Sequence, residues 1–161
     1  MRILVGLTMS ALMAVAAVQA FSPRHTQSLE ETRLAVEKIH FNTLAQSKAA
    51  LVAGGELGKL LYSKDQGKDW KVAKLSQDRQ ALITQVVFAS DGLRGLAVGH
   101  EGWILRTTDG GLSWTEAAFD EKNGEPIMSA ANVQGERWLA VGSFGRALQS
   151  QDDGKTWAPY A

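Results

Sequence analysis

Three copies of one short motif supply most of the residues that could do chemistry in this chain of 161 residues. Each copy reads Ser/Thr-x-Asp-x-Gly-x-x-Trp, and the copies are Ser63, Asp65, Gly67 and Trp70; Thr107, Asp109, Gly111 and Trp114; and Ser150, Asp152, Gly154 and Trp157. The carboxylates are suited either to calcium or to backbone N–H groups in a turn. A calcium loop needs more oxygen ligands than Asp152-Asp153-Gly154 supplies, so we expect turn-forming aspartates.

The other residue types that support catalysis or metal binding are sparse. His25, His40 and His100 are far apart and lack the paired spacing of zinc ligands, and the chain has no Cys. It therefore has no thiol nucleophile, and no Gly-x-Ser-x-Gly sequence marks a serine nucleophile. We expect no catalytic residue, no cofactor and no metal site.

The spacing of the boxes predicts a repeat protein. Trp70 and Trp114 are 44 residues apart, Trp114 and Trp157 are 43 apart, and periods of this length indicate repeat architectures. Within a box, the Asp can accept backbone N–H groups, the Gly can adopt a positive φ, and the Trp can bury a large face against the strands. We interpret the boxes as structural hairpins.

Each repeat carries signals for four short strands. In the second repeat, the runs 83–89, 96–98, 103–107 and 114–117 read as strands, with turn signals between them. Four antiparallel strands in about 44 residues are typical of one β-propeller blade. We predict an all-β, β-propeller-like fold with about three four-stranded antiparallel blades, a partial propeller, at about residues 39–82, 83–126 and 127–161.

The N-terminal residues predict export. An apolar run, 3–18, follows Met1 and Arg2, is short for a membrane span, and leads to small residues at 18–20 that suit a signal-peptidase site. We expect a signal peptide at 1–20, a linker or accessory element at 21–38, and a periplasmic or extracellular mature protein. An uncleaved anchor helix is the alternative. Basic and acidic residues number 17 each, which gives no sign of nucleic-acid binding.

Longer strings in the second and third repeats carry a specific family resemblance. The stretch 95–111, Gly-Leu-Ala-Val-Gly-His-Glu-Gly-Trp-Ile-Leu-Arg-Thr-Thr-Asp-Gly-Gly, and the stretch 138–142, Trp-Leu-Ala-Val-Gly, resemble the photosystem II stability and assembly factor-like family of Asp-box (bacterial neuraminidase, BNR) repeats. The resemblance covers residues 39–161. It implies an exported β-propeller that acts as a binding scaffold and, in non-photosynthetic bacteria, an association with transporters of the resistance-nodulation-division type.

Three repeats are fewer than a closed propeller contains, because closed propellers need at least about four blades. An open arc would leave a blade face and strand edges unpaired at each end. We expect homo-oligomerisation to complete a ring, or a partner to cap the arc. A shortened gene product is a further interpretation.

Asp boxes also occur in sialidases, so a carbohydrate-binding or sialidase-like remnant is an alternative function. Those enzymes use a Tyr nucleophile, and they would require clustered arginines for a substrate carboxylate. This chain offers Tyr62, at a variable strand position, and Tyr160, the next-to-last residue. Its arginines in the repeats are scattered: Arg79, Arg94, Arg106, Arg137 and Arg146. We expect no enzyme activity.

A binding site is expected where the repeats differ. The turn between the second and third strands of each repeat lies opposite the Asp-box hairpin and carries different side chains in each copy, a mixture of aromatic and charged groups suited to a protein surface. The candidate partner-binding rim consists of Glu56, Lys59, His100, Glu101, Trp103, Phe144 and Arg146. The alternative is that Trp103 and Phe144 pack between blades and that the charged residues are ordinary solvated turns.

The sequence therefore predicts a noncatalytic exported binding scaffold, an assembly or accessory factor for an envelope or membrane protein complex. Its expected partner is a protein of the cell envelope, with membrane association only through that partner. A self-assembling structural half-propeller is a further alternative.

Overall fold

The computed structural model describes residues 13, 38–122 and 124–160. The predicted signal peptide, 1–20, lies outside the described residues except for Met13, and so does the predicted element 21–38 except for Lys38. Both remain predictions. The architecture below belongs to the compact unit Ala35–Ala161.

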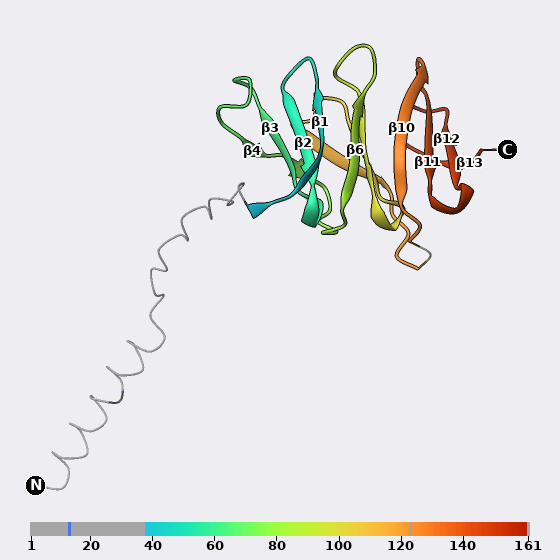
Figure 1. Cartoon of the computed structure of the whole chain (residues 1–161), viewed down its shortest axis with the longest axis horizontal. Coiled ribbons are helices and arrows are strands. Elements are labelled where there is room, and N and C mark those ends of the chain that lie inside the picture. The colour runs from blue at the N-terminus through green and yellow to red at the C-terminus, as the bar shows by residue number, and fades with distance from the viewer. Residues whose placement is uncertain (1–12, 14–37, 123, 161) are drawn as a thin grey trace, which may run out of the picture. The chain divides into compact units, whose positions relative to one another are not determined.

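Three antiparallel sheets follow one another along the chain, one for each repeat (Figure 1). Blade 1 comprises β1 (Phe41–Gln46), β2 (Leu51–Gly55), β3 (Leu60–Ser63) and β4 (Lys71–Val72). Blade 2 comprises β6 (Ile83–Phe88), β7 (Gly95–Gly99), β8 (Ile104–Thr107) and β9 (Ser113–Ala118). Blade 3 comprises β10 (Ile127–Gln134), β11 (Arg137–Gly142), β12 (Ala147–Ser150) and β13 (Ala158–Pro159). The predicted fold class is confirmed.

One strand was not predicted. β5 (Lys74–Leu75) follows blade 1 directly, but it pairs with the outermost strand of blade 2, Lys74 opposite Ser113 and Leu75 opposite Trp114, in parallel. Blade 2 is therefore five-stranded. The linker between the two blades is thus held by backbone hydrogen bonds to the blade that it leads into.

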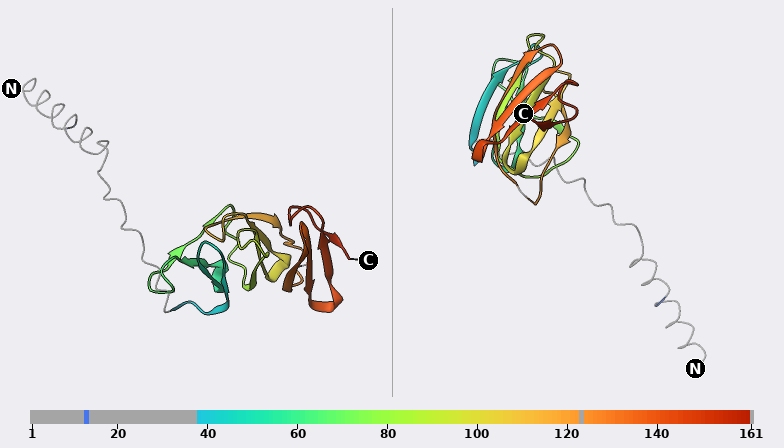
Figure 2. Two further views of the ribbon diagram at one scale, coloured as in Figure 1. Left: turned by 90° about the horizontal axis from the view of Figure 1, so that it is seen from above. Right: turned by 90° about the vertical axis from the view of Figure 1, so that its right-hand side faces the viewer.

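The first strands of the three blades lie side by side, with β6 between β1 and β10, and the blades fan out from them (Figures 1 and 2). The burial of each strand depends on whether its blade lies in the middle or at an end of this series. Every residue of β7 is buried, since blade 2 has a neighbour on both faces, whereas β1 alternates between half-buried and exposed residues.

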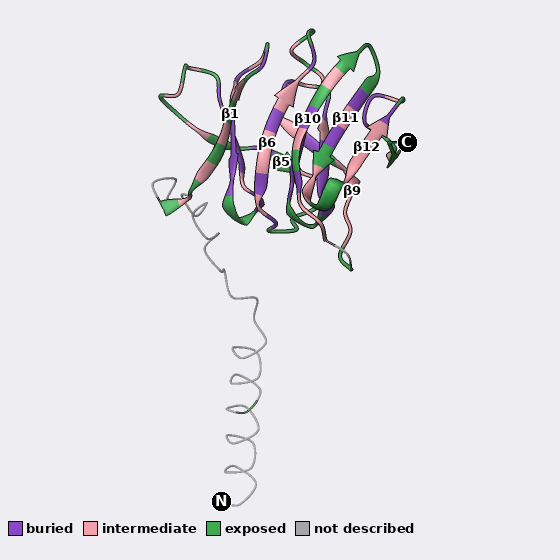
Figure 3. Ribbon diagram, turned by 45° about the vertical axis from the view of Figure 1, so that its right-hand side comes forward, coloured by how far each residue is buried: buried purple, intermediate pink, exposed green. Residues whose placement is uncertain are grey.

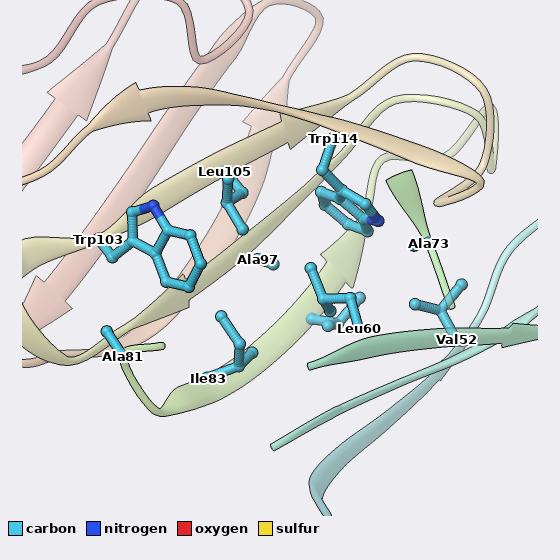
Figure 4. Packing of buried hydrophobic residues seen from close by; sticks show 10 residues of the cluster. Val52, Leu60, Ala73, Ala81, Ile83, Ala97, Trp103, Leu105 and Trp114 are labelled. Atoms are coloured by element: carbon cyan, nitrogen blue, oxygen red, sulfur yellow. The ribbon is translucent and has the colours of Figure 1, made fainter. Parts of the chain in front are cut away.

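The hydrophobic core lies between blades. One cluster joins blades 1 and 2 and includes Val52, Leu60, Leu105 and Trp114 (Figure 4). A second cluster joins blades 2 and 3, with Leu96, Ile104, Ile127 and Trp138 among its members. Each sheet therefore buries its apolar residues against the next sheet, as the strand signals in the sequence require.

Three short 3-10 turns connect the second and third strands of the blades: η2 (Glu56–Gly58), η3 (His100–Gly102) and η4 (Ser143–Gly145). Because the third strand of each blade runs from this turn to the Asp box, the turns and the Asp boxes lie at opposite ends of the blades. Among the described residues, no helix is long and apolar enough to cross a membrane.

Candidate functional site

The Asp boxes form the same hydrogen-bonded hairpin three times. In the second box, Asp109 Oδ1 accepts the backbone N–H groups of Leu112 and Ser113, both at 3.0 Å, and the Thr107 hydroxyl at 2.8 Å. Thr107 Oγ1 in turn accepts the N–H of Gly111 at 3.0 Å, and Trp114 Nε1 donates to the Gly111 carbonyl at 3.0 Å. The carboxylate thus bonds to its own hairpin, which is a structural arrangement.

The first and third boxes repeat these contacts. Asp65 Oδ1 accepts the Asp69 N–H at 2.9 Å, and Asp152 Oδ1 accepts the Thr156 N–H at 2.9 Å. Trp70 and Trp157 each donate from Nε1 to the box glycine at 3.1 Å. In the described part of the chain, no group of three or more acidic or histidine side chains is placed to hold a metal ion.

These hydrogen bonds favour the ionised aspartates. The Thr156 hydroxyl and backbone N–H, with the Ser150 hydroxyl, lower the pKa of Asp152 to about 2. The Asp69 backbone N–H and the Ser63 hydroxyl lower the pKa of Asp65. Burial opposes the shift at Asp109, but the hydroxyl and N–H of Ser113 outweigh it and the pKa is lowered there too.

Acid is therefore expected to loosen the hairpins. Because the folded-state pKa of Asp152 lies below its ordinary value of 3.8, its contribution to stability is present above about pH 4 and is lost as the pH falls toward about 2. Urea unfolding at intervals from pH 6 to pH 2 should show this loss, and Asp152→Asn should make the pH dependence shallower. An identical slope in wild type and variant would contradict the assignment.

The tip residue of each 3-10 turn is in the left-handed region and is not glycine. Leu57 has φ 55°, Glu101 has φ 58° and Phe144 has φ 56°. Such a conformation is uncommon for non-glycine residues and unfavourable for bulky ones. Leu57 is 56% exposed and Phe144 is 91% exposed, so burial does not offset this cost.

The predicted rim residues divide into exposed and packed groups. His100 and Glu101 are exposed. Glu56 lies beside His40, with 3.7 Å between Glu56 Oε1 and His40 Nδ1. Lys59 Nζ pairs with Asp78 at 3.4 Å. The Arg146 guanidinium packs over Gly102, whose Cβ position would lie 3.4 Å from Nη2.

The prediction that Trp103 belongs to the partner-binding rim is wrong. Its side chain is fully buried in the cluster between blades 1 and 2, and Cζ3 would lie 2.9 Å from a Cβ at Gly58. Its Nε1 donates to Glu116 Oε2 at 2.9 Å. The indole therefore fills space against the η2 turn and presents no surface to a partner, whereas Phe144 remains exposed.

One charged cluster was not predicted from the sequence. Asp153, itself buried, pairs with Arg94 Nη1 at 2.9 Å and with Arg106 Nη2, and accepts a hydrogen bond from Trp138 Nε1 at 3.3 Å. The cluster joins blade 2 to blade 3. No periodic signal marks it, because Gln66 and Gly110 stand where Asp153 stands in the third box.

The arginines do not form a sialidase-like site among the described residues. Arg94 and Arg106 converge on a carboxylate of the protein itself, and Arg79 makes a two-point contact with Glu116 at 2.8 and 2.9 Å. The Arg79 hydrogen bonds outweigh burial and lower the pKa of Glu116. Tyr62 instead contacts Lys64, whose Nζ lies 5.9 Å from the ring centroid.

The sheets of four or five strands, the hairpins and the inter-blade cores together define a protein built from Asp-box β-propeller blades. A family model, described as photosynthesis system II assembly factor YCF48, matches residues 8–107. The chain belongs to this family. The comparison with curated proteins gave no match.

Solved structures with the same fold include two YCF48 proteins. The one described as YCF48 bound to D1 peptide has a TM-score of 0.63 and 23% identity, over 75% of this chain and 40% of that one. YCF48 from Cyanidioschyzon merolae has a TM-score of 0.60 and 19% identity, over 75% of this chain and 37% of that one. The GH74 enzyme of Niastella koreensis has a TM-score of 0.51 and 21% identity, over 75% of this chain and 18% of that one.

At these identities the likeness concerns the fold alone. The matched part of this chain spans about two fifths of the length of the two YCF48 structures.

Proposed function

We propose that the chain is a noncatalytic binding scaffold, an assembly or accessory factor that holds a protein partner on the rim formed by η2, η3 and η4. Membership of the YCF48 assembly-factor family supports a binding role. A YCF48 structure described as bound to D1 peptide supports a protein partner.

The observation that carries the proposal is the state of the turn tips. Phe144 is 91% exposed and in a left-handed conformation, a combination that costs stability twice. Leu57, at the equivalent tip of a blade that has a neighbour, shows the same combination. Apolar side chains held in this way are suited to act as anchors in a protein interface, where aromatic residues contribute most binding energy.

The rim also suggests the chemistry of the partner segment. Glu56 directly precedes the apolar tip Leu57, Glu101 is itself the tip of η3, and both residues are in exposed turns. A segment with apolar side chains next to a lysine or arginine would match this arrangement, since complementary charge gives specificity while the apolar anchors give affinity.

The cellular setting is part of the proposal. The apolar run 3–18 and the small residues at 18–20 support export, so the partner would be an envelope or membrane protein, with a transporter as one such complex. The chain would meet the membrane only through this partner. A homo-oligomer or a partner-capped arc would cover the outward faces of blades 1 and 3.

The carbohydrate-binding alternative has less support. Its site would need arginines beside a tyrosine. Arg79 instead pairs with Glu116, Arg94 pairs with Asp91 and Asp153, and Arg106 pairs with Asp153. The Niastella koreensis enzyme shares the propeller fold, which many unrelated functions use.

Replacing both apolar tips is expected to abolish partner capture without weakening the fold. Leu57→Asn together with Phe144→Asn removes the anchors, while Asn tolerates left-handed backbone, so the unfolding temperature should stay level or rise. Crosslinking in cells, with a photoreactive residue at Glu101, would identify the captured envelope protein by mass spectrometry. Leu93→Asn, at the opposite end of blade 2, is the matched control.

The same envelope protein should be crosslinked by wild type and by the Leu93 control, and lost in the double variant. Capture that persists in the double variant would remove the rim from the proposal.

A further inference from the structure

The two outward faces of the described blades are counterparts in the repeat. Each blade has a leading face, which packs on the preceding blade, and a trailing face, which packs on the following one. In blade 2, the leading face carries Val86, Ala97, Leu105 and Trp114, and the trailing face carries Leu96, Val98 and Ile104. In the described chain, the leading face of blade 1 and the trailing face of blade 3 have no neighbouring blade.

We propose that the trailing face of blade 3 binds the leading face of blade 1 of a second copy of this chain, and that two copies close into one ring. The inference deepens the self-association part of the proposed function and does not depend on rim binding.

The leading face of blade 1 carries a hollow of about 380 Å³, lined mainly by apolar residues. Ala53 and Leu61 form its floor as a cross-strand pair, as Ala97 and Leu105 do in blade 2. Leu44, at the position of the buried Val86, is 65% exposed. This face therefore has the composition of an inter-blade core without the side chains that fill one.

The trailing face of blade 3 offers the missing side chains. The cross-strand pairs Leu139–Gln149 and Val141–Ala147 repeat the pairs Leu96–Arg106 and Val98–Ile104 of blade 2. Strands β10 and β11 of this blade carry exposed and half-buried stretches (Figure 3). Val98 is fully buried, whereas Val141 is 49% exposed. Exposed β-branched and aliphatic residues on a wide sheet face are a liability unless another surface covers them.

In each blade, the glycine of the Asp box and the glycine of the 3-10 turn show which side chains would meet across the contact between two copies. A Cβ at the box glycine would contact the preceding blade in two cases, Gly111 against Val52 at 2.6 Å and Gly154 against Leu96 at 2.9 Å. Gly67 meets only side chains of its own blade. Since Leu139 occupies the position of Val52 and Leu96, it would pack on Gly67 and Trp70 of the second copy.

The glycines of the 3-10 turns also show that a covering side chain is missing, here on the trailing face of blade 3. Trp103 covers Gly58, and Arg146 covers Gly102, in each case from the following blade. Nothing lies within 4 Å of a Cβ at Gly145. Lys59 occupies the position of Trp103 and Arg146, directly after the turn glycine, so its aliphatic stem would lie over Gly145 of the second copy.

A hydrogen bond from a backbone N–H to a side-chain oxygen also recurs between the first strands. Thr43 Oγ1 accepts the Val86 N–H at 3.0 Å, and Gln85 Oε1 accepts the Ala130 N–H at 2.6 Å. Ser129 follows in this series as acceptor and Leu44 as donor. The two would therefore join across the contact between copies.

The number of described blades fits a dimer. Closed propellers typically contain about four to eight blades. The described part of one copy has three blades, so two copies bring six together and three copies would exceed the range. A ring of two copies hides all four outward faces, since each copy uses both of its own.

The test is the solution mass of the protein purified in the form that cells produce, by light scattering during size exclusion over a dilution series. Wild type is expected to have the mass of two copies. Leu44→Lys places a charge on the leading face of blade 1, and Val141→Lys places one on the trailing face of blade 3. Each should give monomers, and Leu93→Lys, on blade 2, should remain dimeric.

Mixing the two variants distinguishes the proposed geometry from a symmetric contact between identical faces. The Leu44 variant keeps an intact blade 3 face and the Val141 variant an intact blade 1 face, so the mixture should recover dimers that neither forms alone. A monomeric wild type, or dimers lost in only one variant, would overturn the proposal. Rim binding is read separately by crosslinking, so either idea can fail alone.

Discussion

Replacement of Trp103 with Ala is expected to lower the free energy of unfolding by about 3–5 kcal/mol. The indole is fully buried between blades 1 and 2, and its removal leaves a cavity against Gly58. Glu116 also loses the hydrogen bond that Trp103 Nε1 donates at 2.9 Å. Urea unfolding followed by circular dichroism measures the loss.

Phe144→Ala is the matched control for this experiment, because it removes an aromatic ring that is almost entirely exposed. Its effect should stay within about 0.5 kcal/mol of wild type, as for other surface changes. Equal losses in both variants would mean that Trp103 and Phe144 have the same role, contrary to the structure.

Replacement of Asp153 with Ala is expected to cost about 2 kcal/mol or more. The carboxylate is buried and binds Arg94 and Arg106 at once, so its loss removes one acceptor from each of two partly buried guanidinium groups, of which that of Arg94 keeps Asp91. Because both arginines retain some solvent contact, the cost should fall below that of a fully buried pair.

Two further variants separate charge from backbone effects. Asp153 has φ 63°, and Asn tolerates this conformation, so Asp153→Asn tests the charge alone. Asp78→Ala removes an exposed carboxylate that pairs with Lys59 at 3.4 Å, and should cost less than about 1 kcal/mol. If Asp153→Ala unfolds at the same urea concentration as Asp78→Ala, the cluster does not hold the blades together.

The repeat made much of the fold predictable. The strand runs 83–89 and 96–98 correspond to β6 and β7, because β-branched residues and a turn signal at Asp91-Gly92 act locally. Asp109 bonds within its own hairpin for the same reason, since its partners Thr107, Leu112 and Ser113 lie within four residues of it. β5 escaped prediction, because a two-residue parallel pairing with a strand nearly forty residues further on leaves no local pattern.

The site was harder to predict than the fold. Trp103 and Phe144 flank equivalent turn glycines on opposite sides, and this displacement of two positions decides whether a ring points back onto the preceding blade or out to solvent. The partners Arg94 and Arg106 lie 59 and 47 residues before Asp153. Such contacts depend on how blades stack, and a single sequence holds no signal for them.

The location of the core between sheets has a consequence for how genes of this kind can change length. A single blade separated from its neighbours would expose both of its apolar faces, so an isolated repeat has little on which to fold. Duplicating one whole repeat, however, would insert a leading and a trailing face that already fit those on either side. Gain or loss of whole repeats is therefore the change in length that selection tolerates best. A partial deletion would instead leave one half of a shared inter-blade core without the other half.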